Sequence, residues 1–453
     1  MPATSKEPAV PSLPETAKQT REPRNLAPES LQRFRDIRAQ SWEIARPLSA
    51  EDCMIQSMED ASPVRWHLAH TTWFFETFLL KDQPDYTPID PRFESLYNSY
   101  YNSVGEQFPR AKRGMISRPN LEETCRYRQH VDNAIEACLS DERFSAEQLG
   151  VLEIGLNHEQ QHQELMLTDL KHALSQNPLD PVYQTTSFGP AEESAELTWI
   201  PFDAGVRSVG HDGDRFCYDN EQPRHRVFLE PFEIANRCVT AGEYLEFIEH
   251  GGYERPEFWL SAGWNAVKEL GWEAPLYWKK HRNQWTQFTL AGRQPVDENA
   301  PVSHVSYFEA DAYARWAGAR LATEFEWEVA VNAELADTDT TRLTGNWADC
   351  RFDESHPIHP LGTKTGEKRG RAGRIEDAFG SVWQWTTSHY SAYPGYRAAE
   401  GALGEYNGKF MCGVFVLRGG SCASPSNHIR TTYRNFFAPA SRWQFTGIRL
   451  SRS

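Results

Sequence analysis

A change of pattern near residue 196 constrains this chain more than any other feature. From about residue 28 to residue 180 apolar residues recur at helical spacing, whereas later residues form short β-like runs separated by glycine turns. A length of 453 residues is enough for two or three domains. We therefore predict an α+β multidomain chain with a disordered tail at 1–27, a four-helix bundle at 28–185 and an α+β domain at 196–453.

The helical region divides into four amphipathic segments of the size found in bundles. Their predicted starts are marked by the cap residues Ser30, Ser62, Asn120 and Ser145. The last segment runs to Gln176 and stops before a proline. In the second half, only 241–250 and 308–319 are predicted as helices.

The connection between the second and third segments, residues 83–119, is much longer than the two to eight residues usual in bundles. It is rich in Tyr, Asn and Arg. Because long connections inside a compact domain are usually functional, we expect this loop to contribute to a site.

The charge balance and the cysteines indicate which partners and compartment to expect. The formal net charge of −16 argues against nucleic acid and against anionic membranes as partners, since both require a positive surface. No apolar run is long enough to span a membrane, and the first residues do not resemble a secretion signal. The eight cysteines include no Cys-x-x-Cys pair, which favours reduced thiols in the cytoplasm.

The clearest chemical motif is His158-Glu-Gln-Gln-His162 in the last helical segment. Histidines four residues apart on a helix lie one turn apart on the same face and can bind one metal ion. His70, on an aromatic face of the second segment, supplies a third imidazole. Three inward histidines predict a metal site for zinc or iron(II), and the residues alone leave hydrolysis and oxygen chemistry both open.

With these motifs the chain resembles the hercynylcysteine sulfoxide synthases of ergothioneine biosynthesis. The helical half resembles their DinB-like bundle, and the second half resembles the formylglycine-generating-enzyme (sulfatase-modifying factor) domain, which has a C-type-lectin-like fold. The stretches that carry the resemblance are 66–76, 158–162, 219–225, 239–244, 301–307, 318–327, 377–385, 418–421 and 446–450.

The resemblance implies an enzyme that uses non-haem iron(II) and O₂. It would join the sulfur of a thiol substrate to C2 of the imidazole of hercynine (N-α-trimethylhistidine) and oxidise that sulfur to the sulfoxide. It assigns His70, rather than His67, as the iron ligand beside His158 and His162. Gln161 would hold the hercynine side of the site.

The resemblance also assigns roles in the long loop. Tyr100 and Tyr101 resemble a pair of phenols near the iron, which could deliver a proton or an electron. Arg110 resembles the residue that binds the carboxylate of the thiol substrate, as its guanidinium fork allows. For the nearby basic residues Lys112, Arg113 and Arg118, a solvated patch stays open as an alternative.

A C-terminal segment would form the other wall of the site. Asn435 would bind the carboxylate of hercynine, and Phe436 would line the pocket for its trimethylammonium group. Phe437 departs from family members that use γ-glutamylcysteine, which tend to carry an Asp there. The resemblance therefore implies the type that takes free cysteine.

Several alternatives stay open at this level. They are the same chemistry with γ-glutamylcysteine, the ovothiol-type reaction with histidine, a zinc hydrolase, and a lectin-like binding module without catalysis. A formylglycine-generating activity is disfavoured, because only Cys422 follows Arg418-Gly-Gly-Ser421 where a reactive cysteine pair is needed.

Overall fold

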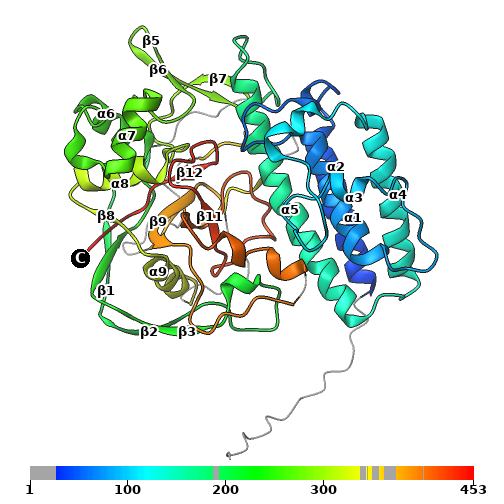
Figure 1. Cartoon of the computed structure of the whole chain (residues 1–453). Coiled ribbons are helices and arrows are strands. Elements are labelled where there is room, and N and C mark those ends of the chain that lie inside the picture. The colour runs from blue at the N-terminus through cyan, green and yellow to red at the C-terminus, as the bar shows by residue number, and fades with distance from the viewer. Residues whose placement is uncertain are drawn as a thin grey trace, which may run out of the picture.

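The computed structural model places a helical part beside a β-rich part (Figure 1). It describes residues 27–186, 193–336, 343, 345–348, 357–361, 374–400 and 402–453. Apart from Ala27, the predicted tail at 1–27 lies outside the described residues. All cysteines within the described residues are free.

The helical part contains four long helices and a loop with two short ones. The long helices are α1 (Ala27–Ala45), α2 (Val64–Phe75), α4 (Leu121–Ser140) and α5 (Ala146–Ser175). Helix α2 continues as a π-helical turn, η2 (Glu76–Leu80). The predicted caps at Asn120 and Ser145 are confirmed, and both form capping boxes. Helix α1 begins three residues before the expected start at Ser30, and the N-cap of α2 is Pro63 rather than the predicted Ser62. No described helix has the length and apolar character needed to cross a bilayer.

The β-rich part combines two four-stranded sheets with smaller ribbons and helices. One sheet has the order β1-β4-β13-β8 (Trp199–Phe202, Phe232–Ala235, Leu450–Arg452, Arg320–Leu321). The other has the order β11-β10-β9-β12 (Asn435–Phe437, Phe415–Arg418, Trp383–His389, Thr446–Gly447). The ribbons are β2-β3 (Gly205–Val209, His225–Leu229) and β5-β6-β7 (Trp278–His281, Gln284–Thr289, Gly292–Pro295).

The helices of the β-rich part are more numerous than the sequence pattern indicated. The predicted pair is confirmed as α6 (Ala241–Glu249) and α8 (Tyr307–Trp316). Two further helices, α7 (Ser261–Leu270) and α9 (Glu324–Ala336), were not expected. Helix α9 buries Glu324, Glu326 and Glu328, and inward acidic residues hide the apolar period by which a helix is detected.

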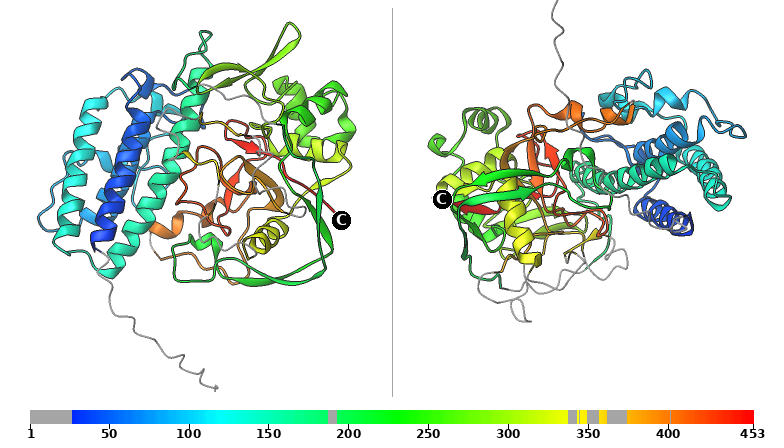
Figure 2. Two further views of the ribbon diagram at one scale, coloured as in Figure 1. Left: turned by 180° about the vertical axis from the view of Figure 1, so that it is seen from behind. Right: turned by 90° about the horizontal axis from the view of Figure 1, so that it is seen from below.

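Helix α5 is shared by the two parts (Figure 2). One side packs on α1 and α2, and the other side presents polar groups to the β-rich part. Several of its side chains bond directly to that part. Among them, Gln161 Nε2 donates to Tyr433 Oη at 2.5 Å, Glu164 accepts from Trp383 Nε1 at 2.7 Å, and Asp169 accepts from Trp443 Nε1 at 3.0 Å. These bonds fix the β-rich part against one face of α5.

The long loop also bridges the two parts. It contains α3 (Phe93–Leu96) and the 3-10 helix η3 (Arg110–Met115). Glu405, at the end of η7 (Ala402–Glu405), accepts the backbone N–H groups of Asn102 and Ser103 at 3.0 and 2.9 Å. The loop is therefore held against the C-terminal segment rather than projecting into solvent.

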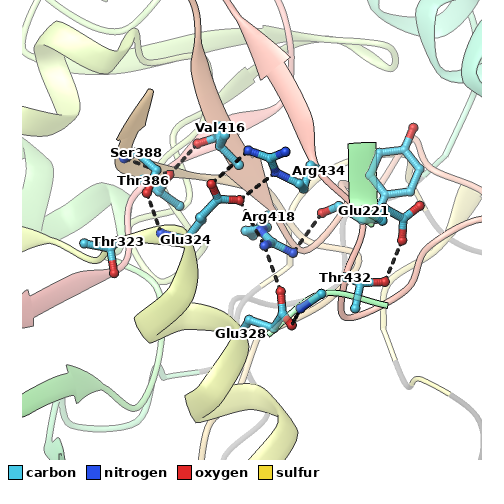
Figure 3. A network of polar contacts seen from close by, with 12 residues as sticks. Glu221, Thr323, Glu324, Glu328, Thr386, Ser388, Val416, Arg418, Thr432 and Arg434 are labelled. Carbon is cyan, nitrogen blue, oxygen red and sulfur yellow. Dashed lines mark hydrogen bonds and ion pairs between the residues drawn. The ribbon is translucent and has the colours of Figure 1, made fainter. Parts of the chain in front are cut away.

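A buried network of ion pairs holds the C-terminal strands on α9 (Figure 3). Glu324 accepts from Arg434 Nε at 2.8 Å and from Arg418 Nη2 at 3.1 Å. Glu328 accepts from Arg418 Nη2 at 2.9 Å. Because Arg434 immediately precedes β11, this network fixes the position of the strand that carries Asn435.

We predict that Glu324→Gln destabilises the fold strongly. The change leaves the guanidinium groups of Arg418 and Arg434 without a shared carboxylate, and breaking a buried ion pair costs about 3–5 kcal/mol. Denaturant unfolding of the variant and of the unmodified protein measures the loss in free energy of unfolding. The control is Glu122→Gln, which breaks an exposed pair with Arg126 and should change stability little. Equal losses in the two variants would contradict the prediction.

Candidate metal centre

The structure brings together the three histidines that the sequence singled out. His70 comes from α2, and His158 and His162 come from α5, one turn apart. One ring nitrogen of each lies within 4.8 Å of the others. All three side chains are buried, with at most 8% of their surface exposed. The expected convergence of two helices on one point is therefore present.

The hydrogen bonds of these rings leave nitrogens available for a metal ion. His70 donates its Nδ1–H to the carbonyl of Tyr97 at 2.6 Å, and its Nε2 has no partner among the described residues. Neither ring nitrogen of His158 has a partner there. Since buried polar atoms nearly always find partners, imidazole nitrogens left bare at one point fit a bound cation.

The electrostatic surroundings keep the rings neutral. Burial lowers the pKa of His158 to about 3. Burial also lowers the pKa of His70 and of His162 well below the usual value, and the neighbouring His158 adds to the effect in both. A neutral imidazole has a lone pair to offer, so the cluster is in the form that binds a metal.

His67 stands behind the cluster rather than in it. Its Nδ1 lies 2.7 Å from Nδ1 of His162, and its Nε2 lies 3.2 Å from Asp169 Oδ2. Its position agrees with the choice of His70 over His67 as the third member of the cluster.

Glu159, which follows the first histidine of the motif, faces away from the cluster. Its carboxylate accepts from Arg38 Nη1 at 2.8 Å, Arg128 Nη2 at 2.5 Å and Ser41 Oγ at 2.6 Å. Burial by itself would raise the pKa of Glu159, but Arg128 and Arg38 outweigh it and lower that pKa to about 2. This carboxylate is engaged on the far side of α5.

A cavity of about 430 Å³ opens from the cluster toward the β-rich part. Most of the predicted site residues line it, namely Tyr100, Arg110, His158, Gln161, His162, Asn435, Phe436 and Phe437. Tyr101 does not. It is fully buried behind Tyr100, with the two rings 4.7 Å apart, and packs on Trp73 and Phe78.

The wall formed by β11 carries aromatic rings. Phe436 stacks on Tyr390 at a centroid distance of 4.1 Å and lies 5.8 Å from Phe410. Asn435 accepts the backbone N–H of Phe436 at 2.9 Å with its Oδ1. Its amide nitrogen is available to a ligand, because no bond from that nitrogen occurs among the described residues.

The two arginines of η3 differ in their surroundings. Arg110 is exposed and donates to the carbonyl of Asp60. Arg113 is buried and stacks 3.4 Å over Trp66. It forms no ion pair with the described carboxylates, and Asp169 attracts it only from a longer distance. Burial, reinforced by Arg110, lowers the pKa of Arg113 to about 9. The view of Arg113 as part of a solvated patch is wrong, because Trp66 covers it, and sequence reasoning missed it as a site residue.

Tyr406 is a second residue that sequence reasoning missed. Its hydroxyl donates to Oε1 of Gln161, and its ring lies 5.6 Å from that of His158. It lines the cavity beside Tyr100, with the two ring centroids 6.2 Å apart. No local motif marks this tyrosine, since its partners lie far away in the sequence.

Comparison with known proteins gives the family of this chain. The sulfatase-modifying factor enzyme 1-like domain matches residues 184–453, and the DinB superfamily matches residues 33–166. A hercynine oxygenase of Mycobacterium tuberculosis is 33% identical over 405 residues, which cover 86% of this chain and 91% of that protein. This chain belongs to the hercynine oxygenase family.

Two further relatives support this family. A hercynine oxygenase of Mycolicibacterium thermoresistibile is 32% identical over 409 residues, covering 86% of this chain and 87% of its own length. Ergothioneine biosynthesis protein 1 of Schizosaccharomyces pombe is 25% identical over 242 residues, covering 52% of this chain and 28% of that protein. The prediction of a DinB-like helical domain before a sulfatase-modifying-factor-like domain is confirmed.

We predict that the metal-free protein loses stability as the pH falls below about 6.5. The unfolded chain protonates each histidine near that pH, whereas His158 in the fold stays neutral down to about pH 3. Each such group lowers the free energy of unfolding by up to about 1.4 kcal/mol per pH unit. Denaturant unfolding between pH 7 and 5 measures the slope. In His158→Asn the free energy of unfolding should depend less steeply on pH. Equal pH dependence in the variant and the unmodified protein would refute the conclusion that His158 is buried as a neutral imidazole.

Proposed function

We propose that this chain binds Fe(II) through His70, His158 and His162 and acts as an oxygen-dependent sulfoxide synthase. The reaction joins the sulfur of cysteine to C2 of the imidazole of hercynine. The C2–H and S–H bonds are lost, and a C–S and an S–O bond form. One atom of O₂ enters the sulfoxide and the other leaves as water, so that O₂ is the oxidant for both bonds.

The observation that carries this proposal is the three-histidine cluster at the end of a cavity whose opposite wall is aromatic and amide-lined. Three neutral imidazoles suit Fe(II), and an ion held by them would have coordination positions left for the substrates and O₂. The ion, when bound, supplies the oxygen and electron-transfer chemistry. The names of the relatives, hercynine oxygenase, support hercynine as one substrate.

Hercynine is placed against the β11 wall in this proposal. Asn435 would donate to its carboxylate, and the face of Phe436 would attract its permanently charged trimethylammonium group. Gln161, oriented by Tyr406 and Tyr433, would hold the imidazole side.

Cysteine is placed against η3. Arg110 and Arg113 would both face its carboxylate. Arg113 is the stronger candidate, because a buried guanidinium that forms no ion pair with a described carboxylate gains most from an anionic ligand. Its bonds to Ser62 Oγ at 3.0 Å and Ser99 Oγ at 2.8 Å hold the guanidinium in place.

Phenols beside the cavity are the candidate proton donors. Burial raises the pKa of Tyr100, Tyr101 and Tyr406, so each hydroxyl stays protonated and can donate. Tyr100 and Tyr406 reach the cavity, and Tyr101 would act through Tyr100. We assign the proton delivery to this group of three phenols.

A zinc hydrolase is a weaker candidate function. In the His-Glu-x-x-His hydrolases the glutamate is the general base beside the metal. Here Glu159 is bound by two arginines on the opposite side of α5, and its low pKa makes it a poor base. A binding module without catalysis would leave the buried histidine cluster without a purpose.

We predict that alanine at His70, His158 or His162 abolishes iron retention, because two imidazoles hold a labile ion poorly. Iron is measured after anaerobic reconstitution and gel filtration. The control is His172→Ala, on the same helix but bonded to Ser57, which should keep iron. Mass spectrometry after adding O₂, hercynine and cysteine then tests for the sulfoxide. Iron retention by all three variants would reject the centre.

We predict that kcat/KM is at least about tenfold higher with cysteine than with γ-glutamylcysteine. This ratio corresponds to about 1.4 kcal/mol of transition-state stabilisation. The glutamyl group adds an ammonium that needs a carboxylate, and Phe437 supplies none. Phe437→Asp should narrow the gap, whereas the uncharged control Phe437→Asn should not. Equal or better turnover of γ-glutamylcysteine by the unmodified enzyme would overturn the choice of thiol and leave the metal centre standing.

A further inference from the structure

A chain of hydrogen bonds leads from the histidine cluster to a buried carboxylate. Asp169 is only 4% exposed. Its Oδ2 accepts the backbone N–H of Ser62 at 2.8 Å and faces Nε2 of His67 at 3.2 Å. Its Oδ1 accepts Trp443 Nε1 at 3.0 Å. The carboxylate is thus held by the start of α2 and by the C-terminal segment at once.

The next link joins two imidazoles. Nδ1 of His67 lies 2.7 Å from Nδ1 of His162, a distance at which one nitrogen must donate and the other accept. The side chains admit two arrangements of the proton. Which one holds decides whether the other nitrogen of His162, Nε2, is bare or protonated, because a neutral imidazole carries one N–H.

The carboxylate selects between the two arrangements. If His67 donates its Nε2–H to Asp169, its Nδ1 accepts from His162, and Nε2 of His162 keeps its lone pair. In the reverse arrangement a lone pair of His67 faces the carboxylate, and Nε2 of His162 carries a proton that blocks a cation. The first arrangement makes both hydrogen bonds, and the second loses one of them.

We propose that Asp169 and His67 are positioning residues that fix the tautomer of His162 so that Nε2 is presented to the metal. The proposal rests on the three-histidine centre of the proposed function. Metal-bound histidines commonly donate their second ring nitrogen to an acceptor that fixes orientation and basicity. His70 has the carbonyl of Tyr97 for this purpose, and His162 has the pair of Asp169 and His67.

The pair also connects the centre to the docking of the two parts. Trp443 belongs to the C-terminal segment and contributes one of the three donors that hold Asp169. The carboxylate that Trp443 contacts is therefore linked to the proposed ligand His162 through two hydrogen bonds, one on each side of His67. Asp169 and His67 act on the cluster through His162 and do not touch the metal or the substrates in this proposal, so they are not catalytic residues.

The test is a titration of the metal-free, full-length protein with Co²⁺, followed by its visible absorption. Asp169→Asn should bind at least about tenfold more weakly, because the amide can offer an N–H to His67 and reverse the chain. The matched control is Glu164→Gln, another buried carboxylate of α5 that accepts a tryptophan N–H but contacts none of the clustered histidines. It should keep the unmodified affinity.

A second variant pair covers the case in which Asp169→Asn fails to fold. His67→Asn keeps an acceptor near the position of Nδ1, whereas His67→Leu removes it. The first should retain affinity within a few fold, and the second should lose at least about tenfold. A merely structural role would not separate the two in this way.

Nitrogen NMR of histidine-labelled, metal-free protein reads the tautomer directly. We expect His162 to be protonated at Nδ1 in the unmodified protein and at Nε2 in Asp169→Asn. Unchanged Co²⁺ affinity and unchanged protonation of His162 in that variant would overturn the role of Asp169 and His67 and leave the histidine centre standing. Failure of the unmodified protein to bind Co²⁺ would reject the histidine centre itself, and the proposal with it.

Discussion

The buried carboxylate of Glu159 fixes the rotation of α5, and the site depends on that rotation. Successive residues of an α-helix are turned by about 100°. With Glu159 bound by Arg38 and Arg128 on the side of α1 and α4, the histidines on either side of it must face α2. The same rotation turns Gln161 toward the β-rich part. One ion-pair cluster therefore sets the direction of the proposed ligands and of the substrate-side groups together.

The β-rich part meets this helix with a wall that is equally constrained. Glu324 on α9 binds both Arg418 of β10 and Arg434 just before β11, so the strand with Asn435 and Phe436 cannot shift without breaking buried ion pairs. Glu405 holds the long loop from the third side. The cavity thus lies between three elements that are each anchored by charged groups, which suits a site that must hold two substrates in register.

Features with a local chemical cause could be predicted from the sequence. The capping boxes at Asn120 and Ser145 and the pairing of His158 with His162 depend only on residues three or four positions apart. The features that could not be predicted depend on residues that are distant in the sequence. The sequence could not show that Trp66 covers Arg113, or that Tyr406 contacts Gln161 from 245 positions away. Helix α9 escaped detection for the same reason, because Arg418 and Arg434 allow its glutamates to be buried.

The two parts contribute different kinds of group to the cavity. All three clustered histidines lie on α2 and α5, whereas Asn435, Phe436 and Phe437 lie on a single edge strand far along the chain. Strand β11 pairs only with β10 among the described strands, so its side chains can change without repacking a neighbour on the other edge. Descendants of this chain could therefore exchange one substrate for another by mutation of a three-residue strand, while inheriting the helical centre unaltered.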